Sequence, residues 1–239
     1  MKKILSALFI LLFASALYAI DLTPAEIVKN IKVNQQKVQD MSAKISTVIK
    51  SEKDKKSMEQ KGLIIVKGKD KSRMEILSPI KQITITNGDS LTIINPETGK
   101  KIAYDLKVLR KKSGDPNLGK SPLDQGKLFD DLDLTVEEKG FFRKQYVLTG
   151  TAKKNNPFMG KVKFYVDQDK FVPTKFEVYG AGDKLVTVTE LDHKQINDVW
   201  IMTKSHSKVD VPSGKIDIEV KLDDVKVNKG IDDSLFSIK

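Results

Sequence analysis

Apolar and polar residues alternate along five segments between Gly160 and Leu222, and this alternation is the clearest structural signal in the sequence. In one of these segments, Val162, Phe164 and Val166 alternate with polar side chains. Successive side chains of a β-strand point to opposite faces of its sheet, so a period of two separates an apolar face from a polar one. The pattern predicts an antiparallel sheet with one solvated face and one covered face.

The first half of the chain carries the same pattern in shorter segments. Tight turns are expected at Asn87-Gly88 and at residues 97–99, where glycine supplies the backbone conformation that a turn needs. These turns separate strands that we predict at residues 60–67, 72–77, 80–87, 90–95 and 100–106. The succession of strands without regular intervening helices predicts a β-meander rather than a parallel α/β fold.

One helix is predicted before the first of these strands. Thr23 is a good N-cap residue, Pro24 suits the first helical position, and Glu26 is placed to complete a capping box. An apolar face at helical spacing follows in Ile27, Ile31, Val38 and Met41. We therefore expect this helix to lie against the sheet.

The middle of the chain interrupts the strand pattern. Residues 107–120 are basic and rich in turn residues, so we expect a loop there. Ser121 is placed to cap a short helix that runs through Leu128, Phe129 and Leu132. An apolar helix between two halves of a meander is expected to cross the sheet as a lid. The alternative is an ordinary surface connection.

Residues 1–19 have the pattern of a cleavable signal peptide. Lys2 and Lys3 precede an apolar run, and Ala19 ends a cleavage site of small residues. The alternative, an uncleaved anchor, needs roughly 17–25 apolar residues, and this run lies at the short end. The sequence has no cysteine, which excludes a lipid-attachment cysteine and disulfides. We predict an exported, periplasmic protein in which residues 20–239 form one soluble domain.

The chain is basic, with a formal net charge of +10. Such a charge is compatible with binding to nucleic acid or to an anionic membrane surface. The lysines, however, are spread along the predicted outward faces of the strands, and no cluster of basic and aromatic residues resembles a nucleic-acid-binding module. We expect a lysine-rich solvated surface and no nucleic-acid partner.

The sequence offers little for catalysis. Its two histidines, His193 in a predicted turn and His206 on a polar strand, are expected at the surface. The aspartate pairs at residues 223–224 and 232–233 fall at predicted turns, where aspartate caps the backbone. The acidic residues within 130–133 lack the alternating oxygen ligands and glycine bend of a calcium loop. We expect no enzymatic activity, no cofactor and no metal.

Several segments, taken in order, resemble a known family. They are residues 72–75, 87–91, 164–167, 172–179 (VPTKFEVY), 185–189, 195–204 (QINDVWIMTK) and 224–236. Their order and spacing resemble the LolA-like outer-membrane lipoprotein-sorting proteins in the broad sense, and the resemblance covers essentially all of residues 20–239.

The resemblance implies a mainly β fold with a few helices: an incomplete, half-open antiparallel β-barrel with helices covering its concave face. It also implies a cavity that shelters the acyl chains of lipoproteins or other lipids. Such a carrier receives its cargo from an inner-membrane ABC-type exporter and delivers it to an outer-membrane acceptor. We expect the chain to be a monomer. An alternative with the same fold is a non-enzymatic envelope sensor or interaction module.

The carrier interpretation selects inward positions of the sheet as cavity candidates: Met74, Ile76, Ile83, Ile85, Val162, Phe164, Val166, Phe176 and Val178. Phe129 and Leu132 are the candidate lid contacts. A plain hydrophobic core would use the same residues. In the best-known carriers a Lys-Arg-Pro segment supplies an arginine that controls the lid, whereas this chain has Lys67-Gly68-Lys69. Arg73 is a candidate for that role, and an outward salt bridge is the alternative.

Overall fold

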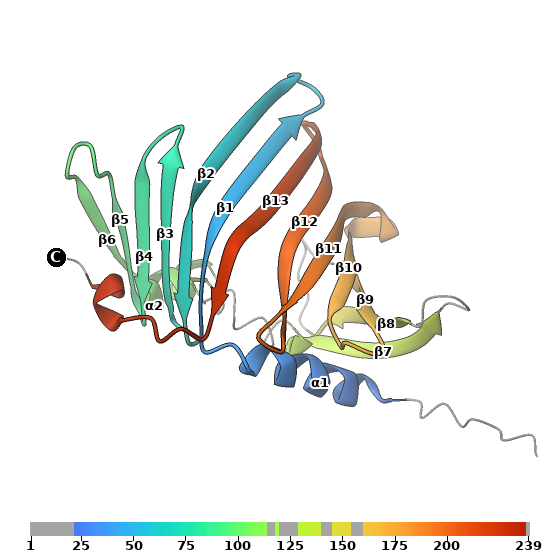
Figure 1. The fold of residues 1–239 in the computed structure, drawn as a ribbon. Coiled ribbons are helices and arrows are strands. Elements are labelled where there is room, and N and C mark those ends of the chain that lie inside the picture. The colour runs from blue at the N-terminus through green and yellow to red at the C-terminus, as the bar shows by residue number, and fades with distance from the viewer. Residues whose placement is uncertain (1–21, 114–117, 120–128, 140–144, 154–159, 238–239) are drawn as a thin grey trace, which may run out of the picture.

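Thirteen antiparallel strands form a single curved sheet (Figure 1), in the order β6-β5-β4-β3-β2-β1-β13-β12-β11-β10-β9-β8-β7. The structure is a computed structural model that describes residues 22–113, 118–119, 129–139, 145–153 and 160–237. Strands β6 and β7 form the two ends of the sheet, which is not closed between them. The predicted fold class, a mainly β protein with an incomplete antiparallel barrel, is confirmed. The predicted signal peptide lies outside the described residues.

The first half of the sheet is a meander of six strands joined by tight turns. These strands are β1 (Asp40–Ser51), β2 (Lys56–Lys67), β3 (Lys71–Ser78), β4 (Gln82–Asn87), β5 (Ser90–Ile94) and β6 (Lys101–Asp105). The predicted turns at Gly88 and Gly99 are confirmed, and both glycines have positive φ, of 62° and 70°. Helix α2 (Leu106–Ser113) follows β6 directly.

The second half contains the five alternating strands that the sequence predicts, preceded by two more. These seven strands are β7 (Leu132–Lys139), β8 (Gln145–Ala152), β9 (Lys161–Asp167), β10 (Pro173–Tyr179), β11 (Leu185–Ile196), β12 (Val199–Val211) and β13 (Gly214–Val227). A short 3-10 turn η2 (Ala181–Asp183) lies between β10 and β11. Strand β13 pairs with β1, so the two halves join in the middle of the sheet.

Helix α1 (Pro24–Gln36) lies across the sheet near one end of the strands (Figure 1). Its predicted capping box is present: the Glu26 amide donates to Thr23 Oγ1 at 3.3 Å, and the Thr23 amide donates to Glu26 Oε2 at 2.8 Å. The helix ends at Gln36, so the prediction that Val38 and Met41 continue its apolar face is wrong. Neither α1 nor α2, the two α-helices of the described chain, has the length and apolarity to cross a membrane.

The sequence interpretation missed strands β1 and β7 and helix α2. The helical apolar spacing that extended through Val38 and Met41 concealed β1. Helix α2 lies where a loop was expected. Its leucines, lysines and arginine are good helix formers, and Asp105, directly before it, accepts a hydrogen bond from the Lys107 amide at 2.7 Å as an N-cap residue does. The predicted short helix is wrong at Leu132, which begins β7; residues 121–128 lie outside the described part of the chain.

A buried carboxylate ties the chain that follows β13 to the start of β1. Asp40 is 5% exposed, and its carboxylate accepts hydrogen bonds from the amides of Lys229 and Gly230 at 2.9 and 3.0 Å. The chain then forms the 3-10 turn η3 (Asp233–Phe236), which Asp232 caps and which packs against β3 and β4. This turn covers part of the sheet face opposite α1.

Candidate functional site

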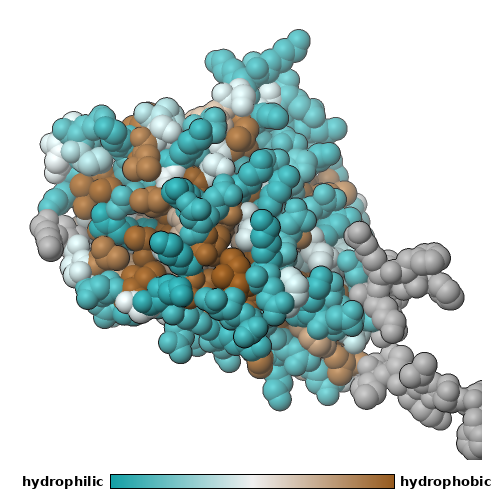
Figure 2. Space-filling view, in the orientation of Figure 1, coloured by the Kyte–Doolittle hydropathy of each residue, from teal (hydrophilic) through white to brown (hydrophobic). Residues whose placement is uncertain are grey.

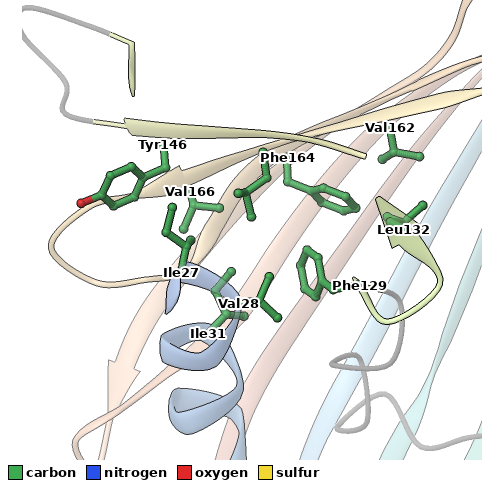
Figure 3. Packing of buried hydrophobic residues seen from close by; sticks show 10 residues of the cluster. Ile27, Val28, Ile31, Phe129, Leu132, Tyr146, Val162, Phe164 and Val166 are labelled. Atoms are coloured by element: carbon green, nitrogen blue, oxygen red, sulfur yellow. The ribbon is translucent and has the colours of Figure 1, made fainter. Parts of the chain in front are cut away.

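A packed core lies between the first half of α1 and strands β7–β9 (Figure 3). Ile27 of α1 lies beside Val166 and Val28 beside Phe129, and the Phe129 ring has its centroid 4.9 Å from that of Phe164. Five of the predicted cavity or lid residues belong to this core, and each is at most 6% exposed: Phe129, Leu132, Val162, Phe164 and Val166. At Val162, Phe164 and Val166 the structure shows a filled core, the alternative that the sequence left open. Phe129 and Leu132 belong to this core and also line a second pocket, of about 780 Å³, bounded by α1 and β7.

The second half of α1 covers a pocket of about 440 Å³ rather than a filled core. The pocket is bounded by the inward faces of β1, β2 and β10–β13, in the centre of the sheet. Its apolar wall includes Val38, Met41, Ile45, Ile64, Val220 and Leu222. Of the predicted cavity residues, only Phe176 lines it, and Val178 packs at the edge of the neighbouring core.

Polar side chains from two adjacent strands lie beside this apolar wall on the same face of the sheet. Thr189 of β11 and Ser205 and Ser207 of β12 all line it, and we call these three residues the hydroxyl ledge. Thr189 Oγ1 and Ser207 Oγ are hydrogen-bonded at 2.8 Å. The sequence interpretation missed the ledge, because β12 is polar on both faces around residue 204 and alternation could not show which side faced inward.

The pocket wall carries no formal charge. The pocket is lined by apolar residues, hydroxyls, two amides, Trp200 and His193, with no Asp, Glu, Lys or Arg among the described residues that bound it. Lys170 lies over the Trp200 ring at 4.9 Å, but its ammonium also pairs with Asp167 at 3.5 Å. An uncharged pocket in such a basic chain favours an uncharged, largely apolar ligand group.

His193 was expected in a surface turn, and this prediction is wrong. The residue lies within β11, next to a register shift between β11 and β12, and its side chain lines the pocket. Burial lowers the pKa of His193 from 6.5 to about 4, because the charged imidazolium loses water that the pocket does not replace. At neutral pH the ring is therefore uncharged, in agreement with the rest of the pocket wall.

Acidification is expected to destabilise the protein through His193. With a pKa near 4 in the folded state and 6.5 in the unfolded state, the unfolded chain binds more protons between these values. Stability is therefore lost as the pH falls from 6.5 towards 4, by on the order of 2 kcal/mol after allowance for partial exposure. Urea unfolding of the wild type and His193→Gln across this range should show a shallower loss in the variant; parallel profiles would contradict the assignment.

The four candidates on β3 and β4 do not share one face. Met74 is the partner of Thr84 and Ile76 of Gln82, whereas Ile83 is the partner of Glu75 and Ile85 of Arg73. Paired residues of an antiparallel sheet lie on the same side, so Met74 and Ile76 face the pocket side and Ile83 and Ile85 face away. The prediction that all four line one cavity is wrong.

The turn η3 explains why β4 turns its isoleucines outward. Ile85 is 3% exposed and Phe236 of η3 is 1% exposed, although both lie on the side of the sheet away from α1. In Figure 2, apolar side chains gather over the β3–β6 half of the sheet, next to η3, while hydrophilic side chains cover the β11–β13 half. Both faces of the first half of the sheet are thus partly apolar, so the prediction of a single covered face does not hold there.

Arg73 also lies on the outer face. Its guanidinium donates to the carbonyl of Leu235 in η3 at 3.1 Å and pairs with Glu75 of the same strand. The outward salt bridge was the alternative to a lid-control role, and the structure shows that arrangement. Arg73 fixes the C-terminal turn to β3 on the side of the sheet opposite the pocket.

Comparisons with known proteins agree with this architecture. A family model described only as an uncharacterized protein matches residues 124–239. No curated protein matches the sequence. A DUF1329 family protein from Desulfovibrio piger is similar over 90% of this chain and 98% of its own, with a TM-score of 0.65 and 14% identity.

Two further solved structures are similar to this chain in fold. A putative outer membrane lipoprotein-sorting protein domain from Vibrio parahaemolyticus has a TM-score of 0.65 and 14% identity, over 89% of this chain and 95% of its own. A LolA superfamily protein from Nitrosomonas europaea has a TM-score of 0.64 and 16% identity, over 91% and 98%. At these identities the likeness shows the fold, so the LolA-like fold inferred from the sequence is confirmed.

Proposed function

We propose that this chain is a non-enzymatic carrier that shelters lipid acyl chains in the pocket beneath α1. The observation that carries the proposal is the uncharged pocket of about 440 Å³ left between α1 and the centre of the sheet. Its size falls within the roughly 300–1,000 Å³ of small-molecule sites. Each methylene that leaves water for such a wall contributes about 0.8 kcal/mol, so an acyl chain has a strong driving force to enter.

The envelope of a bacterium is the proposed place of action. The amino-terminal 19 residues have the signal-peptide pattern, which would deliver the chain to the periplasm. One structural neighbour is described as a putative outer membrane lipoprotein-sorting domain, and its likeness in fold supports an acylated lipoprotein as cargo. In this proposal the protein acts as a monomer between an inner-membrane ABC-type exporter and an outer-membrane acceptor.

Extraction of an acylated peptide from vesicles tests the proposal. Purified protein comprising residues 20–239 is mixed with phospholipid vesicles that contain a fluorescent diacylated peptide, and the vesicles are then sedimented. We expect the peptide to appear in the supernatant in proportion to added protein, whereas the same peptide attached by a transmembrane helix remains with the vesicles. Retention of the diacylated peptide at every protein concentration would overturn the carrier proposal and favour an interaction module with the same fold.

A further inference from the structure

The hydroxyl ledge interrupts an otherwise apolar row that crosses the inner face of the sheet. Strand pairing places these side chains side by side in the order Phe164, Phe176, Thr189, Ser207, Ile218 and Ile49. On one side of the two hydroxyls the row is aromatic, with Phe164 and Phe176, and on the other side it is aliphatic, with Ile218 and Ile49. A surface that served only to bury hydrocarbon would gain nothing from two hydroxyls at its centre, because burial of a polar group without a partner is unfavourable.

The ledge has donor capacity that the described protein does not use. Thr189 Oγ1 and Ser207 Oγ share one hydrogen bond at 2.8 Å, and a pair of hydroxyls carries two protons, so one proton has no acceptor in that pair. The Ser205 hydroxyl makes no hydrogen bond to any described residue. Thr189 is only 4% exposed, whereas Ser205 and Ser207 are half-buried, so the two serines supply most of the hydroxyl surface that faces the pocket. The ledge therefore presents unused hydroxyl protons to whatever fills the pocket.

The described pocket wall carries no formal charge, and this distinguishes among the lipid groups that accept hydrogen bonds. A fatty-acid carboxylate accepts from hydroxyls but brings a charge, and the described pocket wall contains no lysine or arginine to neutralise it. The Lys170 ammonium near Trp200 is engaged by Asp167. An ester carbonyl accepts the same hydrogen bonds without a charge, so it fits both the hydroxyls and the neutral wall.

We propose that Thr189, Ser205 and Ser207 bind the ester carbonyls of a neutral glycerolipid group and so select ester-linked acyl chains. This inference rests on the proposed carrier function and names the chemical group that the pocket recognises. The ester carbonyl lies on the ledge, and the acyl chain extends along the apolar wall formed by β1, β2 and β13. The ledge fixes the depth at which the chain enters, because only one position along a lipid tail carries a carbonyl.

A pair of lipids that differ in one carbonyl isolates this contact. 1-Palmitoylglycerol has an ester carbonyl, and 1-O-hexadecylglycerol has the same chain length and glycerol group with an ether in its place. Trp200, the single tryptophan of the chain, lines the pocket, so its fluorescence reports binding of either lipid. We expect the wild type to bind the ester about three- to tenfold more tightly, the effect of one net hydrogen bond.

Removal of the hydroxyls should abolish this preference without abolishing binding. The triple variant Thr189→Val/Ser205→Ala/Ser207→Ala preserves approximate side-chain size, and we expect it to bind ester and ether equally, with the ether bound at least as tightly as by the wild type. Thr187→Val is the matched control: Thr187 also faces inward on β11, opposite Val209, but does not line this pocket. It should retain the wild-type ratio. Circular dichroism confirms that each variant is folded.

The outcomes separate this inference from the carrier proposal. If the wild type binds both lipids equally, or the triple variant keeps the preference, the ledge does not recognise carbonyls although the carrier function stands. Tighter binding of palmitic acid than of 1-palmitoylglycerol at neutral pH would also overturn the inference. If the wild type binds none of these lipids, the carrier function itself fails.

Discussion

The Val220→Trp substitution is expected to reduce extraction of the diacylated peptide at least tenfold while the protein remains folded. Val220 lines the pocket from β13 and is half-buried, directly opposite Ser205 of β12. An indole at this position occupies the space in which the acyl chain would lie. Because it extends into a pocket rather than a filled core, its cost to stability should stay below the roughly 1–3 kcal/mol of overpacked interiors. The vesicle extraction assay measures the effect.

A valine on the outer face provides the matched control. Val48 of β1 is also half-buried, but it is the partner of Glu219 and therefore faces away from the pocket. Val48→Trp adds the same volume to the same sheet and should leave extraction unchanged. Equal losses in both variants would show a general effect on the sheet, and an unchanged Val220→Trp would show that acyl chains do not occupy this pocket.

The Phe164→Ala substitution is expected to lower the free energy of unfolding by about 3–5 kcal/mol, the range for a large aromatic side chain removed from a packed core. Phe164 is 3% exposed and its ring contacts Phe129 in the cluster beneath α1. Urea unfolding monitored by circular dichroism measures the loss. A charged residue at this position would leave an unpaired buried charge, so Phe164→Glu tests the stability of the fold rather than lipid uptake.

The paired phenylalanine on β10, Phe176, allows the loss of stability to be compared between core and pocket. It is the partner of Phe164 on β10 and is half-buried, because it packs against the edge of the core and also lines the pocket. Phe176→Ala should therefore cost less than Phe164→Ala, because part of its surface is not packed in the wild type. A larger loss at Phe176 than at Phe164 would contradict the division between filled core and open pocket.

The sequence predicts the architecture well where local physics determines it. Strand β9 alternates strictly, and its apolar residues Val162, Phe164 and Val166 are buried as expected. The start of α1 follows from its capping box, which is a local arrangement of Thr23 and Glu26. Alternation fails on β3 and β4, where η3 arrives from the distant end of the chain and covers a second apolar face.

The pocket is harder to predict, because a pocket is the space that side chains leave unfilled. Val166 in the core and Val220 in the pocket wall are the same residue type on equally regular strands. What separates them is the position of α1, whose first half packs against β7–β9 and whose second half stands over the pocket. Ser205 and Ser207 resemble solvated residues in the sequence, and only pairing with Thr189 and Leu191 places them on the inner face.

Native mass spectrometry of the protein, purified gently from the cells that make it, shows whether the space beneath α1 is a receptor for acyl chains or a gap in the core. We expect a mass adduct that corresponds to an ester-linked lipid or an acylated peptide, and this adduct should be lost in Val220→Trp and retained in Val48→Trp. A bare protein mass that also stays bare after incubation with the diacylated peptide would show that the space is a gap in the core.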